Sequence, residues 1–523
     1  LPIKAALGHR RLSIIDLSEA GHQPMSNKRK TIWVVLNGEI YNYQELRENL
    51  IKRGHSFYTH SDTETIVHLY EDLGKDCLSK IDGMFAFAIW DSKKEELFLA
   101  RDRFGIKPFF YVESQGRFLF ASEIKALLED KEIKRDIDFA ALDNYLSLLS
   151  EVPLGVFLSG GLDSTSIVAS VANLSSEPLK TFTIGFKRKS YSELLEAELV
   201  AKMYGCFHQG YIMEPQIIPE ILPEIITHIG EPLGDLASTA EYLVSKFAKR
   251  DVTVVLRGNG GDEVFGGYPT HYLYKIARIY RRFPFFLHRI LENVINNLPV
   301  STERLSFDYK LKSFIRAARY ESDEKAHFGW KEIFNKEDKE RLYSNLMKEE
   351  VKEHNSFEVF SQFFEEIKDF DIINKLLYLD LRVFMAGCGL AVGDFTSMAH
   401  SLEARFPFLD HKLVEFASTI PPELKVSGFR TKYIFRKAMA KYLPKRIIKM
   451  KKRGFVIPMA EWLKLELKDY VRNILSSSNI RKIGLLNEDY VNRLLDEHFN
   501  GKRDNTRQIT CLLSLSLWYE LFV

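Results

Sequence analysis

An apolar run near the middle of the chain leads into a glycine-rich turn and then into a helical pattern. Residues 152–158 are mostly apolar, which is typical of a buried parallel strand. After the Ser-Gly-Gly turn at 159–161, apolar residues recur at helical spacing from Ile167 to Leu174. Such a turn is either an ordinary strand-to-helix connection or an anion site, because glycine allows close approach and helix N-termini attract phosphate. No Gly-Lys-Ser/Thr follows, which excludes a Walker P-loop.

A second strand ends in a similar turn. Residues 251–268, DVTVVLRGNGGDEVFGGY, read as a strand, a glycine-rich turn and the start of a helix. Asp163 and Asp262 each follow one of the two strand ends. Each carboxylate alone could cap a helix, but two of them above one parallel sheet could hold Mg²⁺ against phosphate oxygens. The pair therefore predicts a nucleotide site on a doubly wound parallel sheet.

The first part of the chain alternates strand and helix patterns and predicts an α/β domain rich in sheet. Two helices are expected at 42–54 and 61–74, with capping boxes Asn42/Glu45 and Ser61/Glu64. The expected strands are 30–41, 83–91, 96–102 and 117–123. A charged connector from 131 runs into a further helix, and 180–186 is a strand of the second part. Residues 270–380 read as mostly helical.

Composition and charge exclude several classes of function. Basic residues number 73 and acidic residues 71, so the overall balance predicts no nucleic-acid and no membrane partner. The four cysteines are scattered without metal-ligand spacing, which indicates a reducing cytoplasm. No apolar run is long enough to cross a bilayer, and no signal peptide opens the sequence.

Several motifs resemble those of one enzyme family across nearly the whole chain. The segment Ser159-Gly-Gly-Leu-Asp-Ser164 resembles the pyrophosphate loop of ATP pyrophosphatases that form adenylates. Residues 258–268, 401–416 and 451–458 resemble the synthetase domain of glutamine-dependent asparagine synthetase. The segments HRRLSIIDLS, NGEIYN, SDTE, GMFAFAIWD and RDRFGIKPFFY are similar to its class II amidotransferase domain. The likeness is weakest from 270 to 375.

The resemblance implies a two-domain α/β architecture. Residues 1–130 would form the type 2 amidotransferase domain, an αββα sandwich of the Ntn type, followed by a connector at 131–150. Residues 151–523 would form the doubly wound ATP-pyrophosphatase domain with helical additions. The implied activity is ATP-dependent conversion of aspartate to asparagine through a β-aspartyl-AMP intermediate. Pyrophosphate would be released when this intermediate forms. Ammonia from glutamine would then pass through a tunnel and displace AMP. ATP, Mg²⁺, aspartate and glutamine are the implied ligands, and a homodimer is possible.

The resemblance also implies a glutamine pocket in the first domain. Asn37 and Gly38 match the oxyanion hole, where an amide and a backbone N–H stabilise a tetrahedral intermediate. The implied glutamine-binding residues are Arg11, Ile14, Asn37, Gly38, Glu39 and Asp62. From the sequence alone, Asn37-Gly38 could equally be a hairpin turn and Asp62 a residue that favours a helix N-terminus.

Two parts of the family pattern are missing from the sequence. The family nucleophile is a cysteine at the mature N-terminus whose α-amino group acts as base. This sequence begins at Leu1, inside the pattern, and its first cysteine is Cys77, so as written it should not hydrolyse glutamine. A segment of several dozen residues is also missing after Leu149. We expect the native protein to contain both.

For the second domain, the resemblance implies a nucleotide site and a metal site. Lys452 matches the lysine that faces the adenylation transition state, and Asp163 and Asp262 would bind Mg²⁺. The implied ATP and pyrophosphate residues are Leu158, Ser159, Gly160, Gly161, Asp163, Ser164, Ile184, Gly258, Asn259 and Tyr268.

Some positions depart from the family pattern. Asn259 stands where most relatives have Asp or Glu, so accepting a proton from the attacking ammonium would fall to Glu263 or water. Arg257 replaces the usual Ser and is expected to add positive charge beside the nucleotide. Residues 386–396 lack several polar groups that relatives carry there.

Three functions remain open from the sequence. The first is asparagine synthetase. The second is a related adenylating enzyme with another acceptor, such as a β-lactam synthetase or lasso-peptide cyclase; these lack a working glutaminase cysteine, whereas this sequence keeps the glutamine pocket. The third is a non-catalytic interaction protein with the same fold, which the departures at Asn259 and 386–396 would favour.

Overall fold

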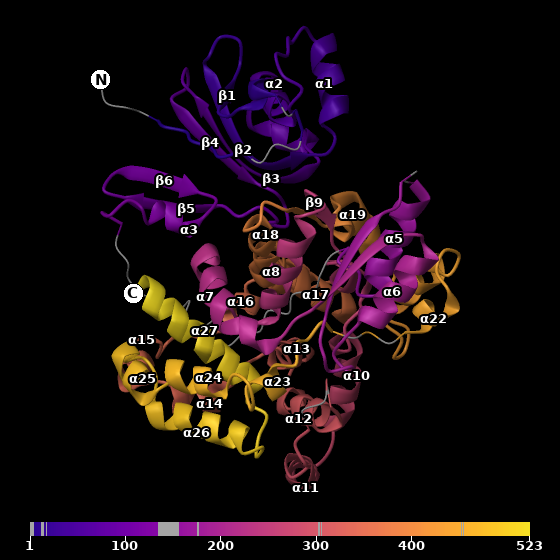
Figure 1. Cartoon of the computed structure of the whole chain (residues 1–523), viewed down its shortest axis with the longest axis vertical. Coiled ribbons are helices and arrows are strands. Elements are labelled where there is room, and N and C mark those ends of the chain that lie inside the picture. The colour runs from indigo at the N-terminus through magenta and orange to yellow at the C-terminus, as the bar shows by residue number, and fades with distance from the viewer. Residues whose placement is uncertain are drawn as a thin grey trace. The chain divides into compact units, whose positions relative to one another are not determined.

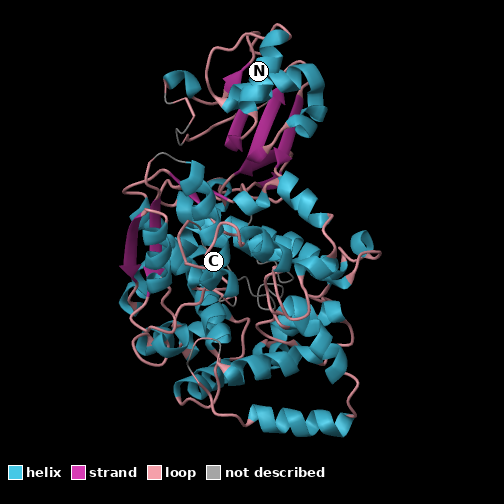
Figure 2. Ribbon diagram, turned by 90° about the vertical axis from the view of Figure 1, so that its right-hand side faces the viewer, coloured by secondary structure: helices cyan, strands magenta, loops and turns pink. Residues whose placement is uncertain are grey.

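The chain divides into two compact units, Leu1–Ile133 and Lys134–Val523. The computed structural model describes residues 5–11, 15–16, 18–133, 156–174, 177–301, 304, 306–450, 452 and 454–523. Side chains at 173, 365, 386–389 and 391 are not described. Figures 1 and 2 show the elements of each unit. No helix in these ranges is both long and apolar enough to cross a membrane.

The first unit is built on an antiparallel sheet with strand order β1-β2-β3-β4. Its strands and helices are β1 (Met25–Ser26), β2 (Ile32–Ile40), β3 (Gly83–Asp91), β4 (Glu96–Arg101), α1 (Tyr43–Lys52) and α2 (Asp62–Leu73). Apolar residues of β2, β3 and α2, among them Val34, Ile66 and Phe87, form one buried core. A hairpin of β5 (Phe110–Ser114) and β6 (Arg117–Ala121) follows, with short helices η1 (Glu19–Gly21), η2 (Gly74–Lys80) and α3 (Ile124–Leu127).

The strands expected from apolar patterns in this unit are confirmed, but the two capping boxes are wrong in detail. The Asn42 side chain donates to Lys80 O and accepts from Asp82 N, and it makes no cap bond to α1. The Ser61 hydroxyl does accept from Thr63 N. The Glu64 carboxylate, however, accepts from the backbone N–H groups of Tyr58 and Thr59. Asn42 is thus taken by partners about 40 residues away in the chain, and Glu64 by the loop that immediately precedes the helix.

The second unit contains parallel strand pairs. Strand β7 (Lys180–Gly185) runs parallel to β8 (Phe207–Ile212) and also forms a parallel bridge between Phe182 and Phe157. Strand β9 (Val254–Leu256) runs parallel to β10 (Glu403–Arg405). Helices α5 (Leu162–Leu174), α6 (Leu194–Met203), η3 (Pro215–Ile217), α7 (Ile218–Ile229) and α8 (Ala237–Ala248) flank these strands. The expected strand at 152–158 is described only from 156, and the connector and helix at 134–150 lie outside the described residues.

The remainder of this unit is mostly helical, as the sequence predicts for 270–380 (Figure 2). From the second turn onward the helices are α9 (Gly261–Phe265), α10 (Thr270–Tyr280), α11 (Phe285–Asn296), α12 (Phe307–Ala318), α13 (Asp323–Gly329), α14 (Lys336–Leu342), α15 (Asn345–Glu350), α16 (Glu358–Ser361), η4 (Glu365–Ile367), α17 (Ile372–Leu379), the π-helix η5 (Asp380–Leu390) and α18 (Ala391–Met398). After β10 come η6 (Pro407–Leu409), α19 (His411–Ser418), α20 (Pro422–Lys425), α21 (Tyr433–Met439), α22 (Lys445–Lys449), α23 (Met459–Trp462), α24 (Lys468–Ile474), α25 (Ser477–Ile483), α26 (Glu488–Phe499) and α27 (Thr506–Phe522).

Candidate active sites

The two glycine-rich turns of the second unit meet at one pocket. The Ser159 hydroxyl accepts from Gly161 N at 3.2 Å and lies 3.0 Å from the Ser164 hydroxyl, which fixes the turn before α5. Asp163, in the first turn of α5, faces the second turn. Gly258 lies close enough that an added Cβ would be 3.4 Å from the Asp163 Cβ. The sheet therefore brings the two motifs together.

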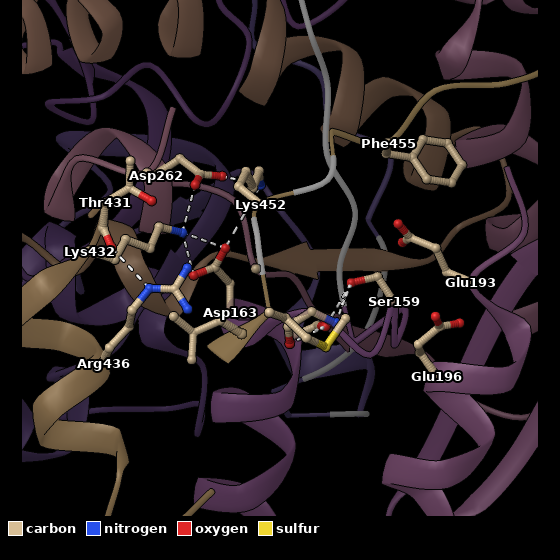
Figure 3. Close-up of a pocket in the computed structure, with 16 residues that line it drawn as sticks. Ser159, Asp163, Glu193, Glu196, Asp262, Thr431, Lys432, Arg436, Lys452 and Phe455 are labelled. Atoms are coloured by element: carbon tan, nitrogen blue, oxygen red, sulfur yellow. Dashed lines mark hydrogen bonds and ion pairs between the residues drawn. The ribbon is translucent and has the colours of Figure 1, made fainter. Parts of the chain in front are cut away.

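Asp163 and Asp262 share two lysine ammonium groups (Figure 3). Lys432 Nζ lies 2.5 Å from both Asp163 oxygens and 2.7 Å from Asp262 Oδ1. Lys452 Nζ donates to Asp262 Oδ2 and lies 4.0 Å from Asp163 Oδ2. A Cβ on Gly267 would lie 1.7 Å from Asp262 Oδ1, so only glycine permits this approach.

The lysines keep this site ionised despite its burial. Burial by itself raises the pKa of Asp262, but Lys432 and Lys452 lower it well below the usual range. Burial likewise lowers the pKa of Lys452, and the charges of Asp262 and Asp163 raise it above its ordinary value. The pocket thus contains two ionised lysines that are paired with Asp163 and Asp262, and Arg436 also lines it. Cationic side chains at such a turn can bind a polyphosphate.

Most of the predicted phosphate residues line this pocket. The site residues predicted from the sequence that line it are Ser159, Gly161, Asp163, Ser164, Gly258, Asp262 and Lys452. Leu158 and Ile184, expected at the adenosine, are buried in and beside the parallel strands and are not among the lining residues. Gly160, Asn259, Glu263 and Tyr268 also lie outside the lining set. The functional roles of all these residues, those that line the pocket and those that do not, stay predictions.

Sequence reasoning missed several lining residues. They are Leu162, Glu193, Glu196, Gly267, Thr431, Lys432, Arg436, Met450 and Phe455. In Figure 3, Lys432 and Arg436 lie on one side of the pocket, and Glu193, Glu196 and Phe455 lie on the other. Lys432 has φ +52°, a strained value for a residue with a side chain, and such strain often marks functional sites. The only signal in the sequence is the basic pair at i and i+4, which by itself resembles a solvated helix face.

Next to the pocket, Glu263 and Asn259 lie buried behind the second turn. The Tyr268 hydroxyl donates to Glu263 Oε1 at 2.5 Å. Burial and the Asp262 charge raise the pKa of Glu263 to about 7. The Asn259 side chain is 1% exposed, and both of its amide atoms lack a hydrogen-bond partner within the described part of the chain. A buried amide in this state is suited to contact a ligand, since unpaired buried polar groups are unfavourable.

A buried cluster around Asp380 supports Tyr268. Asp380 oxygens lie 2.8 Å from His271 Nε2, 2.7 Å from His327 Nε2 and 2.5 Å from Lys331 Nζ. The Tyr268 N–H donates to His271 Nδ1 at 3.3 Å, so the cluster is joined to the second turn. Two histidines and one carboxylate are close enough together to hold a metal ion, and the Lys331 ammonium pairs with the same carboxylate.

The expected position of the Arg257 charge is wrong. The Arg257 side chain is fully buried, its Nη2 lies 2.7 Å from Glu241 Oε2 on α8, and its Nη1 donates to Gly393 O on α18 at 2.7 Å. The guanidinium also lies 5.8 Å from the Phe157 ring centroid and 5.6 Å from that of Phe406. Arg257 is therefore paired with Glu241 and is not among the residues that line the nucleotide pocket.

The first unit positions the predicted oxyanion residues on a strand. Asn37 and Gly38 lie within β2, opposite Ala86 and Phe85, and so do not form a hairpin turn. Gly38 has φ +141°, and a Cβ there would lie 2.1 Å from Met84 O. The buried Asp62, at the start of α2, accepts from Ile40 N at 2.9 Å. Burial raises the pKa of Asp62, and these contacts bring Asp62 to the same end of β2 as Gly38.

Arg11 is held near that strand end by backbone carbonyls. Its guanidinium donates to Ile15 O and, at 2.6 Å, to Asp16 O. The Asp16 carboxylate in turn accepts from His60 N at 2.7 Å, just before α2. The structure therefore brings Arg11 toward the helix that carries Asp62. Glu39 lies on β2, and the predicted contact of Ile14 lies outside the described residues.

Cys77 has none of the properties of an active nucleophile. It is fully buried in η2, and burial raises the pKa of its thiol to about 11. The thiolate is the nucleophilic form, so this environment disfavours reaction.

Comparison with known proteins identifies the family. A family model described as "Asparagine synthase" matches residues 145–520, and a "Glutamine amidotransferase domain" model matches residues 2–158. The chain belongs to the asparagine synthase family. It is thus a ligase-type chain that carries an N-terminal glutamine amidotransferase domain, and both parts of the resemblance seen in the sequence are confirmed.

Relatives in this family cover nearly the whole chain. "Asparagine synthetase [glutamine-hydrolyzing] 1" of Bacillus subtilis is 34% identical over 98% of this chain and 89% of that protein. "Putative asparagine synthetase [glutamine-hydrolyzing]" of Mycobacterium bovis is 30% identical over 99% of this chain and 89% of that protein. "Amidase chry2" of Gibberella zeae is 24% identical over 94% of this chain and 87% of that protein. The names of these relatives thus state different activities.

Proposed function

We propose that this asparagine synthase family member converts aspartate to asparagine with ATP and glutamine. The β-carboxylate of aspartate attacks the α-phosphorus of ATP, forming β-aspartyl-AMP and releasing pyrophosphate. Ammonia then attacks the acyl carbon and displaces AMP. Residues 1–130 would release ammonia from glutamine, 131–150 would connect, and 151–523 would carry out adenylation and amide formation. The single observation that carries this proposal is the Asp163–Asp262–Lys432–Lys452 cluster between two glycine-rich turns.

In this proposal the leaving pyrophosphate binds at the first turn. Ser159, Gly161 and Ser164 supply hydroxyl and backbone N–H groups, and Lys432, Lys452 and Arg436 oppose the negative charge that develops. Fixed positive charge in a buried pocket favours a transition state in which pyrophosphate leaves more than it favours ATP itself. Gly160, Leu158, Ile184 and Gly258 would border the nucleotide.

The carboxylates of Asp163 and Asp262 fit Mg²⁺. Lys432 Nζ lies within 2.7 Å of oxygens from both, so the two groups converge on one cation position. Oxygen donors of this kind are those that Mg²⁺ prefers, together with phosphate oxygens. When bound, the ion would neutralise charge on the polyphosphate.

For the nitrogen step, Glu263 would accept the proton that Asn259 cannot. Its carboxylate is buried beside the second turn, and the Tyr268 hydroxyl holds one of its oxygens. Asn259, buried and unpaired among the described groups, would contact substrate through its amide.

In the first unit, Asn37 and Gly38 would stabilise the oxyanion of glutamine hydrolysis, and Arg11, Ile14, Glu39 and Asp62 would bind glutamine. The position of Gly38 and Asp62 at one end of β2 supports this assignment. The buried Cys77 is unsuited to serve as nucleophile.

The test is pyrophosphate release from ATP and Mg²⁺ by the full-length protein. Aspartate-dependent release with ammonium and with glutamine, together with asparagine as product, supports the proposal. Release with ammonium alone would mean that the amidotransferase half is inactive. If aspartate elicits no release with either nitrogen source, the proposal is wrong.

A second candidate function is amidation of a larger acceptor. A cavity of about 660 Å³ shares Phe455 with the nucleotide pocket. Arg316 and Arg507 also line this cavity, and the Nε atoms of both lack hydrogen-bond partners within the described ranges. Cavities of roughly 300–1,000 Å³ bind ligands larger than an amino acid. A panel of carboxylic acids in the same assay separates the candidates, since only this one predicts release with another acid and none with aspartate. Failure to bind ATP at all would instead indicate a non-catalytic protein.

A further inference from the structure

A strip of the second unit from α10 through α11 exposes an unusual set of side chains. Its exposed apolar residues are Ile276, Ile279, Phe283, Phe285, Phe286, Ile290 and Val294. Its exposed charged residues are Arg278, Arg282 and Arg289, and the other exposed residues in 276–299 are Asn and Pro. Every residue in this range is described, and no exposed residue in it is acidic. We refer to these exposed residues of 276–299 as the basic apolar face.

Three of the exposed apolar residues share one side of α11. Phe286, Ile290 and Val294 are four residues apart on α11 and so lie on one side of that helix. On the other side, Leu291 packs against the small core around Ala277 and Trp330. Only the inner side of α11 therefore packs against the rest of the unit. The helix has no fully buried residue, and it is labelled at the lower edge of its unit in Figure 1.

This amount of exposed apolar surface requires an explanation. Phe285 is 75% exposed, Phe286 59% and Val294 59%. Single exposed apolar residues are ordinary, but a contiguous patch of this kind marks an interaction site.

The charges select the kind of partner. Arg278 and Arg281 both pair with the buried Asp323. The one acidic residue of the strip, the half-buried Glu292, accepts from the Tyr280 hydroxyl and pairs with Arg319, so Arg282 and Arg289 carry the exposed charge of this strip. A second copy of the chain meeting the same face by two-fold symmetry would bring arginines against arginines. Anionic lipid offers apolar chains directly beneath negative headgroups, which is the arrangement that an amphipathic basic helix fits.

We propose that the basic apolar face docks α11 on an anionic lipid surface. Phe286, Ile290 and Val294 enter the boundary between headgroups and acyl chains, and Arg282 and Arg289 contact lipid phosphates. The near-zero net charge of the whole chain, which predicts no membrane partner, averages over this local excess of positive charge. The proposal is independent of the proposed function.

The test is co-sedimentation of the full chain with phosphatidylcholine vesicles that contain or lack phosphatidylglycerol. The wild type is expected to bind the anionic vesicles, and this binding should weaken as the salt concentration rises. It should bind the neutral vesicles only slightly. Phe286→Ser combined with Ile290→Ser should lower the partition coefficient about tenfold or more. Arg282→Gln combined with Arg289→Gln should lower it by a comparable factor.

The matched control is Phe416→Ser combined with Leu465→Ser, two residues that are 64% and 63% exposed elsewhere in the unit. It should bind vesicles as the wild type does, and unchanged circular dichroism should accompany every variant. The proposal is overturned if the wild type binds neither vesicle, or if the control loses as much binding as Phe286→Ser/Ile290→Ser. A second result also overturns it. If Phe286→Ser/Ile290→Ser changes the oligomeric mass measured without lipid, and the wild type binds no vesicles, then a second copy of the chain covers the face.

Discussion

The ammonium group of Lys432 lies 2.5 Å from both carboxylate oxygens of Asp163, although 269 residues separate them in the chain. The same group lies 2.7 Å from Asp262. Lys432 is therefore the residue that joins the two glycine-rich turns, and its removal should affect adenylation directly.

Lys432→Met should lower the rate of aspartate-dependent pyrophosphate release by about 10²-fold or more, because it leaves the buried Asp262 and the half-buried Asp163 with less positive charge. Lys432→Arg should restore part of the rate, since it keeps the charge. The control is Lys437→Met, an exposed lysine on the same helix α21. A normal rate in Lys432→Met would contradict the role given to this residue.

Glu263→Gln should separate the two half-reactions. ATP–pyrophosphate exchange with aspartate should persist, because adenylation makes no use of a proton acceptor at this position. Asparagine formation should fall by about 10²- to 10⁴-fold, the usual range for loss of a general base. Glu423→Gln, an exposed position on α20, serves as the control. An equal loss in both half-reactions would show that Glu263 acts only by holding the second turn in place.

The buried pair of Arg257 and Glu241 should behave as a coupled unit. Arg257→Met should lower the free energy of unfolding by about 3–5 kcal/mol, because it leaves Glu241 buried without its partner. Adding Glu241→Gln should recover part of that loss, with a coupling energy of about 0.5–3 kcal/mol in a double-mutant cycle. Urea unfolding of the four proteins measures this coupling, and strictly additive losses would mean that the pair contributes no mutual stabilisation.

Stability should decline below neutral pH through His327. Burial lowers the pKa of His327 to about 4, whereas an unfolded histidine titrates near 6.5. Below about pH 6.5 the unfolded chain therefore binds a proton that the folded chain rejects, and this stabilising contribution is lost as pH falls toward 4.

His327→Gln removes this contribution. The difference in free energy of unfolding between wild type and His327→Gln should shrink as pH falls from 7 to about 4.5. Urea denaturation at several pH values provides the measurement. A difference that stays constant with pH would indicate that His327 has the same pKa in the folded and the unfolded chain.

Local patterns predicted the framework of the nucleotide site. The strand-turn-helix sequences around Asp163 and Asp262 predicted that two carboxylates would meet, because parallel strands present their carboxyl ends at one edge. The family resemblance was visible from the same residues. The alternation of apolar residues also predicted β2, β3 and β4.

Other features depended on contacts that no local pattern contains. Lys432 reads as one lysine of a basic helix, and only the folded chain places it between Asp163 and Asp262. Arg257 was expected beside the nucleotide, but its guanidinium pairs with the buried Glu241 on α8. Asn42 was expected to cap α1, but its side chain hydrogen-bonds to the backbone of Lys80 and Asp82.

The sequence by itself determined the family, the two-domain α/β class and the positions of the glycine-rich turns, because these depend on short motifs and on hydrophobic periodicity. The tertiary structure decided which charges neutralise one another and which apolar side chains of α11 remain exposed. The reason is physical: electrostatic energy and burial depend on separation in space, and residues far apart in sequence come into contact only when the chain is folded.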